Sequence, residues 1–499
     1  MFGATGWFAP SNARRVGQTA YCSGVVRGEK GRTTVCVSDR TMGRTGIRRI
    51  ASFAAYALLI LGCGAYAAPG ALEKIDGGVF PLRIETGKRY LVEASGRPFL
   101  LHGDAAWSLM VQPTRPEVDD YLDDRRQRGF NALLVNLIER RFSADPPRDA
   151  YGDGPFLVPD DFGTPNERYF EHVDWVLRRA AQNGFLVLLV PAYLGYGGGD
   201  QGWYMALRRN GTEKLREYGR YLGHRYSNYP NILWVHGGDF NPPDRSVVQA
   251  IAEGIREADP EALATVHCAR GTAARELWGG ESWLSVNNIY SGKSVSEDAW
   301  REYRRPDRMP FFLIEAYYEN EHWMTTRLAR TQAYHAILGG AAGQVFGNNP
   351  IWHFGTPGVS DVGVGWRQAL NSPGSRSMAV LRNFFSTFDW WRLEPDMTGA
   401  VLTAGAGTPK FRAVAAIADD RSFAIAYLPT TREVTIDLGR LSGPQVRVRW
   451  FDPATGRYLA IPGSPFRASG TRTFDPGRNN GANETDWVLV LESIQGGSN

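Results

Sequence analysis

Eight short apolar runs alternate with amphipathic segments between Pro81 and Trp391. Most runs are continuously apolar, as expected for strands buried on both faces of a parallel sheet. Eight strand–helix units over roughly 310 residues fit a (β/α)₈ TIM barrel of the α/β class. No glycine-rich phosphate fingerprint follows the first run, which disfavours a dinucleotide-binding fold. The predicted strands are Phe99–His102, Ala132–Asn136, Leu186–Pro191, Ile232–His236, Ala264–His267, Leu284–Asn288, Phe311–Glu315 and Gln344–Gly347.

Helix-start signals stand before three of the amphipathic segments. The segments Thr114–Glu117 and Thr164–Glu167 both fit the capping-box pattern. Pro165 would occupy the first helical position of the second one. Asp244 is predicted to cap the helix that follows it. These signals place helices between the predicted strands.

The pattern changes near residue 395, where short alternating runs separated by turn signals replace the helices. Alternation of this kind is typical of a β-sandwich. We therefore predict a barrel domain over residues 78–395 and a small all-β sandwich domain over residues 398–495. The predicted strands of the second domain are Phe423–Leu428, Glu433–Leu438, Val446–Phe451 and Trp487–Leu491.

The first 67 residues are expected to be a leader with a signal peptide. Basic residues within Arg44–Arg49 precede the apolar run Ala51–Leu61, and Ala65–Ala67 has the small-x-small pattern of a cleavage site. The run is too short to span a membrane comfortably. Residues 1–41 are polar and irregular and are expected to be disordered, so Met42 is the expected true start. The mature protein is predicted to be exported, to the periplasm or the cell exterior.

A lipoprotein is the alternative, because Ile60–Cys63 resembles a lipobox whose cysteine would be lipidated. Only this alternative predicts a membrane partner. Beyond residue 67 there are 47 basic and 50 acidic residues, so no nucleic-acid-binding surface is indicated. Cys268 is then the only remaining cysteine, which excludes an intramolecular disulfide and a cysteine-based metal site. It is expected to be a buried apolar residue.

Two carboxylates follow predicted strands in the barrel. Glu315 ends one apolar strand, and Asp239 follows another after Gly237 and Gly238. Burying a carboxylate there costs desolvation free energy, so it is expected either to be paired with another group or to have a role in catalysis. Glycosidic cleavage needs such a pair, one acid for the leaving oxygen and one carboxylate that attacks or activates water. Structural carboxylates that cap helices or pair with arginine are the alternative.

Polar and aromatic residues gather at the other strand ends, where barrel enzymes place substrate-binding groups. Aromatic rings suit stacking on sugars, amides suit hydroxyl groups, and histidines suit either role or the orientation of a carboxylate. Core packing and turn formation are the competing interpretations. The glycine-rich segment Tyr193–Gly202 is expected to be a mobile loop. The candidate substrate-binding residues are Asp104, Trp107, Asn136, Tyr193, His236, Asn241, His267, Tyr290, Tyr317, Asn348 and Trp352.

No His-Glu-x-x-His motif and no Gly-x-Ser-x-Gly elbow occurs in the sequence, so neither a metal nor another cofactor is predicted. Several strand-end segments resemble the apiosidase-like glycoside hydrolases: Gly103–Trp107, Trp234–Asn241, Ile314–Tyr317 and Gly347–Trp352. The segments Trp450–Pro453 and Asp486–Leu489 are similar to the collagen-binding-type β-domain that often follows such barrels. Together the two resemblances cover about residues 78–495.

The resemblance implies that Asp239 is the acid/base and Glu315 the nucleophile of a retaining enzyme. Where the larger clan ends its fourth strand in Asn-Glu, this chain has Gly238 and Asp239, and Asn241 would replace the missing asparagine. The resemblance does not fix the substrate, and our hypothesis is an exo- or endo-acting hydrolase of a plant or bacterial polysaccharide. An inverting enzyme, or a non-catalytic carbohydrate- or matrix-binding protein with a degenerate barrel, is the alternative.

Overall fold

The computed structural model describes residues 79–292, 294–321, 323–359 and 362–495. The predicted leader, signal peptide and lipobox lie outside these residues. Among the helices described, none is long and apolar enough to cross a membrane. Cys268 is buried and free, which confirms the expectation from the sequence.

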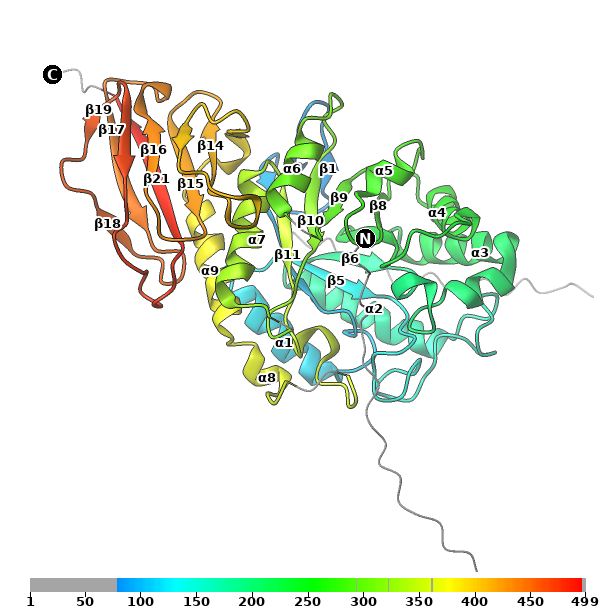
Figure 1. Cartoon of the computed structure of the whole chain (residues 1–499). Coiled ribbons are helices and arrows are strands. Elements are labelled where there is room, and N and C mark those ends of the chain that lie inside the picture. Colours follow the sequence, from blue (N-terminus) through cyan, green and yellow to red (C-terminus); the bar gives the residue numbers. More distant parts are fainter. Residues whose placement is uncertain (1–78, 293, 322, 360–361, 496–499) are drawn as a thin grey trace, which may run out of the picture. The chain divides into compact units, whose positions relative to one another are not determined.

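Eight parallel strands form one sheet in the order β8-β7-β6-β5-β4-β11-β10-β9 (Figure 1). The pairing of β4 with β11 joins the first and last strands, and this confirms the predicted barrel. Between β8 and β9 the side-chain amide of Asn288 donates to Thr265 Oγ1 at 2.8 Å and to the Val266 carbonyl at 2.7 Å. The strands are β4 (Leu101–Ala105), β5 (Ala132–Asn136), β6 (Leu186–Val190), β7 (Ile232–Gly237), β8 (Leu263–His267), β9 (Asn287–Tyr290), β10 (Phe311–Glu315) and β11 (Gly343–Phe346).

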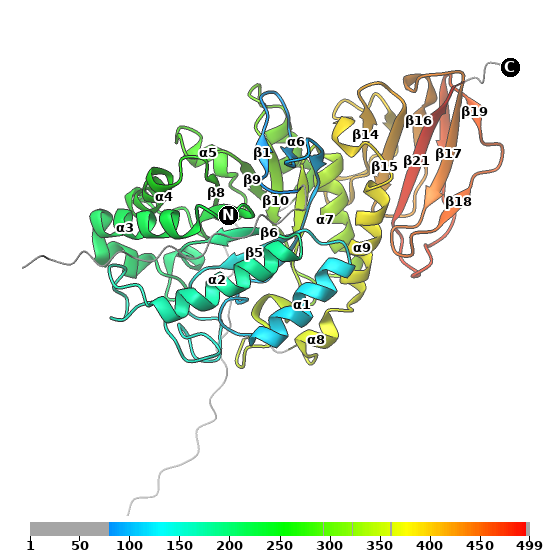
Figure 2. The same cartoon turned by 180° about the vertical axis from the view of Figure 1, so that it is seen from behind.

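Helices alternate with these strands along the chain and lie outside the sheet (Figure 2). They cover the apolar outer faces of the strands, so the strands are buried on both sides, as their continuous apolar runs indicate. The helices are α1 (Arg115–Gln127), α2 (Glu167–Gln182), α3 (Tyr204–Tyr226), α4 (Ser246–Ala258), α5 (Ala274–Trp278), α6 (Val295–Tyr303), α7 (Thr326–Leu338), α8 (Trp366–Ala369) and α9 (Pro373–Phe385).

Strands β5 and β10 have the predicted bounds, whereas β9 begins three residues later than predicted. The backbone N–H groups of Ser285 and Val286 both donate to the Ala264 carbonyl, so this apolar segment approaches β8 before it pairs with β10. This segment is buried like a strand but does not pair in the sheet, which explains why β9 was predicted to begin too early.

A small antiparallel sheet made of β1 (Arg83–Ile84), β2 (Leu91–Val92) and β3 (Pro98–Phe99) precedes the barrel. Side chains of β2 and β3 share one buried cluster with the side chains that fill the barrel interior. Because β3 leads directly into β4, this sheet covers the N-terminal ends of the barrel strands. It does not cover the C-terminal ends of the barrel strands.

The helix caps are confirmed in part. Thr114 forms the predicted capping box at the start of α1. The second capping box is wrong: α2 is capped by Asn166, whose side chain accepts the N–H of Arg168, and Pro165 lies before the helix. Asparagine accepts such a bond at least as well as threonine, which explains the shift. Asp244 accepts the backbone N–H of the first residue of α4 at 3.1 Å.

An all-β region follows the barrel, as predicted. One sheet contains β12 (Leu393–Pro395), β14 (Val414–Ala418), β15 (Phe423–Leu428), β17 (Gln445–Phe451), β18 (Tyr458–Ala460), β19 (Phe466–Arg467) and β21 (Trp487–Ile494). The other contains β13 (Leu402–Ala404), β16 (Val434–Asp437) and β20 (Thr471–Phe474). Side chains from both sheets form one buried cluster, as in a sandwich.

Helix α7 contacts this β region through the buried, charged side chain of Arg330. The Arg330 guanidinium donates to both oxygens of Asp486, at 2.8 and 2.7 Å, and to Ser377 Oγ at 3.0 Å. One turn along α7, the Tyr334 ring stacks on Tyr427 of β15 with the ring centroids 4.6 Å apart. Both regions belong to one compact unit.

Candidate active site

Glu315 reaches the barrel interior because β10 is irregular at its end. Side chains alternate along a strand, so Glu315 would share the outward face of Leu313, which packs among helices. The register with β9 shifts between Leu313 and Glu315. Such bulges re-aim side chains beside active sites. Here the bulge turns the carboxylate toward the barrel axis.

Asp239 is held by a tight turn after β7. Gly237 and Gly238 have φ of 84° and 130°, and Asp239 itself has φ of 47°. A Cβ on Gly237 would lie 2.5 Å from the His267 carbonyl oxygen, and one on Gly238 would lie 2.2 Å from the Tyr193 ring. The two glycines are therefore required by close backbone approach, and the turn points the short aspartate side chain inward.

Replacing Gly238 with alanine is expected to displace the Tyr193 ring and, with it, Asp239. A displacement of about 1 Å in a catalytic group can lower kcat on the order of 10²-fold. Steady-state kinetics of Gly238→Ala against Gly280→Ala would check this, because a Cβ at Gly280 meets nothing within 4 Å. Equal activity of the two variants would contradict the role given to the turn.

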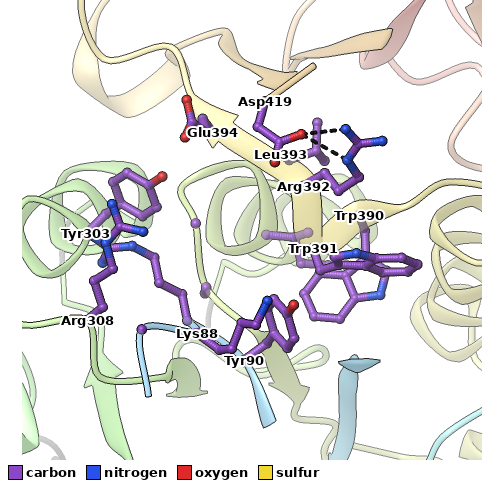
Figure 3. Close-up of a pocket in the computed structure, with 15 residues that line it drawn as sticks. Lys88, Tyr90, Tyr303, Arg308, Trp390, Trp391, Arg392, Leu393, Glu394 and Asp419 are labelled. Atoms are coloured by element: carbon purple, nitrogen blue, oxygen red, sulfur yellow. Dashed lines mark hydrogen bonds and ion pairs between the residues drawn. The ribbon is translucent and has the colours of Figure 1, made fainter. Parts of the chain in front are cut away.

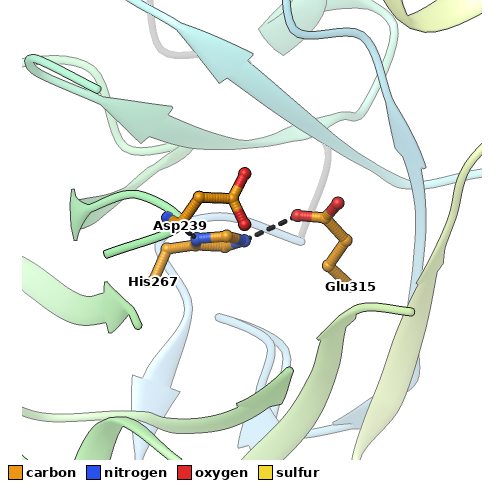
Figure 4. Close-up of side chains that lie close together, drawn as sticks. All are labelled: Asp239, His267 and Glu315. Atoms are coloured by element: carbon orange, nitrogen blue, oxygen red, sulfur yellow. Dashed lines mark hydrogen bonds and ion pairs between the residues drawn. The ribbon is translucent and has the colours of Figure 1, made fainter. Parts of the chain in front are cut away.

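His267 connects the two carboxylates, and the three side chains point toward one another (Figure 4). The backbone N–H of Asp239 donates to His267 Nδ1 at 3.0 Å, and His267 Nε2 lies 2.7 Å from Glu315 Oε2. Because Nδ1 accepts a hydrogen bond, the imidazole proton is on Nε2 and is donated to Glu315. This hydrogen bond favours the ionised form of Glu315.

Ligand atoms of Asp239, His267 and Glu315 all lie within 4.8 Å of one another. Three such residues could in principle hold a metal ion, and within the described parts of the chain they are the one group of this kind. A metal on His267 Nε2 would have to displace the proton that Glu315 accepts. The arrangement therefore fits acid–base chemistry better than metal ligation.

Burial and the nearby Asp239 charge raise the pKa of Glu315, and the His267 hydrogen bond opposes them. Burial also raises the pKa of Tyr193 well above its usual value. Its phenol therefore stays protonated and donates to Asp239 Oδ2 at 2.7 Å.

Aromatic rings form the wall around the carboxylates. Trp107 lies 5.7 Å from Tyr193 and 5.6 Å from His267 between ring centroids, and Tyr290 lies 5.0 Å from His267. The Trp107 indole N–H donates to the hydroxyl of Tyr318 at 2.8 Å. Four of the predicted substrate-binding residues (Trp107, Tyr193, His267 and Tyr290) thus surround the two carboxylates. Tyr318 joins them and was not predicted.

Two of the predicted residues face outward instead. Asp104 is fully buried and accepts hydrogen bonds from Tyr121 (2.8 Å) and Arg125 (3.4 Å) of α1, and burial raises its pKa to about 6. His236 packs edge-on against Trp283, and burial lowers its pKa to about 3. Successive side chains along a strand point to opposite faces, and each of these residues is next to one whose side chain points inward. Both belong to the core between strands and helices.

Three predicted asparagines are held by neighbouring protein groups. Asn136 donates to Glu139 at 2.9 Å, and Asn348 donates to Glu319 at 2.7 Å. Asn241 donates to Thr272 and accepts the N–H of Ala269, which ties the loop after β7 to the loop after β8. In this structure, therefore, Asn241 positions a loop beside the site.

Further residues lie around the carboxylates, after β8 and β10 and near the end of β11. Tyr317 stacks against the guanidinium of Arg270, 4.5 Å from its ring centroid, and Arg270 donates to the Tyr290 hydroxyl at 2.7 Å. The Trp352 indole donates to Glu321 at 3.0 Å, and burial raises the pKa of Glu321 to about 7. Arg270 and Glu321 were not predicted. Arg270 follows His267 by three residues, and Glu321 lies in the loop after β10, where charged residues usually face solvent.

The Tyr193–Gly202 segment, predicted to be a mobile loop, is bonded to the Asp239 turn. The backbone N–H of Leu194 donates to the Gly237 carbonyl at 3.2 Å, and that of Gly197 donates to the Asp239 carbonyl at 3.3 Å. The segment includes the short 3₁₀ turn Tyr196–Gly198. These bonds couple the position of the loop to that of Asp239.

Solved structures similar to this chain are glycoside hydrolases. A glycoside hydrolase family 5 protein from Bacteroides vulgatus ATCC 8482 superposes with a TM-score of 0.72 at 25% identity, covering 83% of this chain and 92% of its own. A second structure, named glycoside hydrolase, has the same TM-score and identity and is covered over 97%. A search of curated proteins finds no match.

Family models divide the chain where its fold changes. Residues 398–492 match the "Putative collagen-binding domain of a collagenase". Residues 85–392, the barrel with both carboxylates, match the model described as "Apiosidase-like, catalytic domain". This model covers more than half of the chain, and the similar structures share its activity class. The chain therefore belongs to the apiosidase-like family of glycoside hydrolases.

Proposed function

We propose that the enzyme hydrolyses glycosidic bonds with retention of anomeric configuration. The observation that carries this proposal is the spacing of the carboxylates, with an oxygen of Asp239 within 4.8 Å of an oxygen of Glu315. Retaining enzymes have carboxyl groups ~5–5.5 Å apart, whereas inverting enzymes keep them ~6.5–9.5 Å apart to admit a water molecule. The short spacing supports direct attack by one carboxylate.

In the first step, Glu315 attacks the anomeric carbon as Asp239 protonates the departing oxygen, so a glycosyl ester forms and the glycosidic bond breaks. In the second step, Asp239 takes a proton from water, and the resulting hydroxide displaces Glu315 from the sugar. The hydrogen bond from His267 stabilises Glu315 both before attack and as leaving group. Tyr193 holds one oxygen of Asp239 and leaves the other to exchange the proton.

Replacing His267 with phenylalanine is expected to shift the acidic limb of the pH–rate profile toward higher pH. The nucleophile works when ionised, so activity falls as the pH drops through the pKa of Glu315. Burial and Asp239 already raise this pKa, and loss of the His267 hydrogen bond raises it further. The pH dependence of kcat/KM for wild type and His267→Phe measures the shift. An unchanged acidic limb would contradict the proposed link.

We further propose that the substrate is a plant or bacterial polysaccharide and that the mature enzyme is exported. The aromatic wall suits sugar stacking, and the basic–apolar–small pattern before residue 68 supports export. Screening the mature protein against pectic and arabinose-type glycans, with product analysis by NMR, tests the substrate class. Release of a sugar supports the proposal. Binding without release from any glycan would instead favour a non-catalytic carbohydrate-binding protein.

A further inference from the structure

A second pocket lies away from the catalytic cleft (Figure 3). Its volume is about 320 Å³, which is at the small end of the range for ligand sites. It is lined by the loop Gly87–Tyr90 before β2, by Tyr303 at the end of α6 and Arg308 after it, and by Trp390–Glu394 and Asp419. The first of these loops belongs to the sheet that covers the N-terminal ends of the barrel strands. The pocket therefore stands at the opposite end of the barrel from Asp239 and Glu315.

Three of the four cations that line this pocket make no ion pair with a carboxylate in the part of the chain that the structure describes, although the pocket also contains Glu394 and Asp419. Within the described residues, Lys88, Arg89 and Arg308 make no ion pair with a carboxylate, whereas Arg392 pairs with Asp419 and Asp420, both at 2.8 Å. Burial lowers the pKa of Arg89, and the charge of Arg308 lowers it too, whereas Tyr303 and the Glu394 carboxylate oppose them. Lys88, Arg89 and Arg308 outnumber Glu394, the one carboxylate of the pocket that Arg392 does not pair with, so the site has an excess of positive charge and is suited to an anionic group.

Flat aromatic surfaces stand beside these cations. The Arg89 guanidinium lies over the Tyr303 ring, 4.1 Å from its centroid, which fixes the plane of its donors. Tyr90 meets Trp390 edge to face at 5.9 Å, and Trp391 also lines the pocket. Figure 3 shows Tyr303 and Arg308 on one side and the two tryptophans on the other. Rings provide apolar faces for sugar C–H groups, and guanidinium groups bind carboxylates with paired hydrogen bonds.

We propose that this pocket is a non-catalytic binding site for an acidic saccharide, in which Arg89 and Arg308 bind the carboxylate of a uronate residue and the tryptophans contact its ring. The choice of a saccharide rests on the proposed hydrolase function, whereas the choice of an anion rests on the unpaired cations. Occupation of the site would hold an acidic polysaccharide on the enzyme while another part of the chain reaches the cleft.

The test measures binding to the Glu315→Ala protein by isothermal titration calorimetry, with α-1,4-linked trigalacturonate as probe and maltotriose as its neutral counterpart. Inorganic phosphate serves as a simple anion. Arg308 is exposed, so Arg308→Ala is expected to fold normally, and it should weaken trigalacturonate binding about tenfold, the loss of one charge-assisted hydrogen bond. Arg304→Ala is the matched control, because Arg304 is exposed nearby but does not line the pocket.

Selective binding of trigalacturonate that Arg308→Ala weakens and Arg304→Ala does not would support the proposal. Equal binding of maltotriose, equal loss in both arginine variants, or phosphate binding without trigalacturonate binding would each overturn it. The single variant Arg308→Ala, which retains Glu315, should hydrolyse a short neutral substrate at the same rate as wild type. Loss of trigalacturonate binding with hydrolysis intact would separate failure of this site from failure of the hydrolase proposal.

Discussion

Replacing Glu315 with alanine is expected to lower kcat by about 10⁴-fold or more, since it removes the group that forms the intermediate. Asp239→Ala is expected to cost ~10²–10⁴-fold, the usual worth of a general acid, and less with leaving groups that need no proton. Both variants should keep the fold, because the site lies at strand ends rather than within the core. Steady-state kinetics with aryl glycosides of different leaving-group pKa would measure both effects.

External azide distinguishes the two roles. In Glu315→Ala, azide can take the place of the missing carboxylate and attack once, so the glycosyl azide should have inverted configuration. In Asp239→Ala, azide should attack the glycosyl-enzyme, so the product should have retained configuration. Glu321→Gln is the matched control, because Glu321 is a half-buried carboxyl near the same site, whose pKa is affected by Glu315. If Glu321→Gln were as impaired as Glu315→Ala, the assignment of the nucleophile would be wrong.

Replacing Arg330 with alanine is expected to give the largest loss of stability, about 3–5 kcal/mol in the free energy of unfolding. The Arg330 and Asp486 side chains are both completely buried. Removing the guanidinium leaves the Asp486 carboxylate in the interior with no opposite charge, and Ser377 loses a donor. Urea denaturation followed by tryptophan fluorescence would measure the change.

The double variant Arg330→Met/Asp486→Leu is the control for this prediction. Apolar residues of similar size replace the buried pair, and Glu484, which also pairs with Arg330, keeps some contact with solvent, so stability should recover toward wild type. Arg304→Ala, which removes an exposed arginine, should change stability by less than ~0.5 kcal/mol. An equal loss in the single and the double variants would show that the packing of Arg330, rather than its charge, stabilises the junction.

The sequence predicted the barrel well because buried parallel strands have a strong local signature. Continuous apolar runs bounded by polar residues correctly predicted where β5 and β10 begin and end. The boundary of β9 failed because the residues before it are buried without belonging to the ladder. Burial and strand pairing have the same apolar pattern, so hydrophobicity alone could not separate them.

The sequence predicted which residues gather at the candidate site, but it predicted less well the direction in which their side chains point. Strand ends showed where Asp239, His267 and Glu315 would gather, but the bulge that turns Glu315 inward leaves no mark in the sequence. Asp104 and His236 could have been recognised as outward-facing from strict alternation along their strands. Arg270 could not, since its place between Tyr290 and Tyr317 depends on how the ends of three separate strands, β8, β9 and β10, come together.

The central claim is that Glu315 attacks the sugar directly in a retaining mechanism. Proton NMR of the first sugar released, recorded before mutarotation, tests it most directly once a cleavable glycan is known. The account predicts that the product initially has the same anomeric configuration as the substrate. Initial release of the opposite anomer would contradict it, because inversion requires water rather than Glu315 to attack the anomeric carbon.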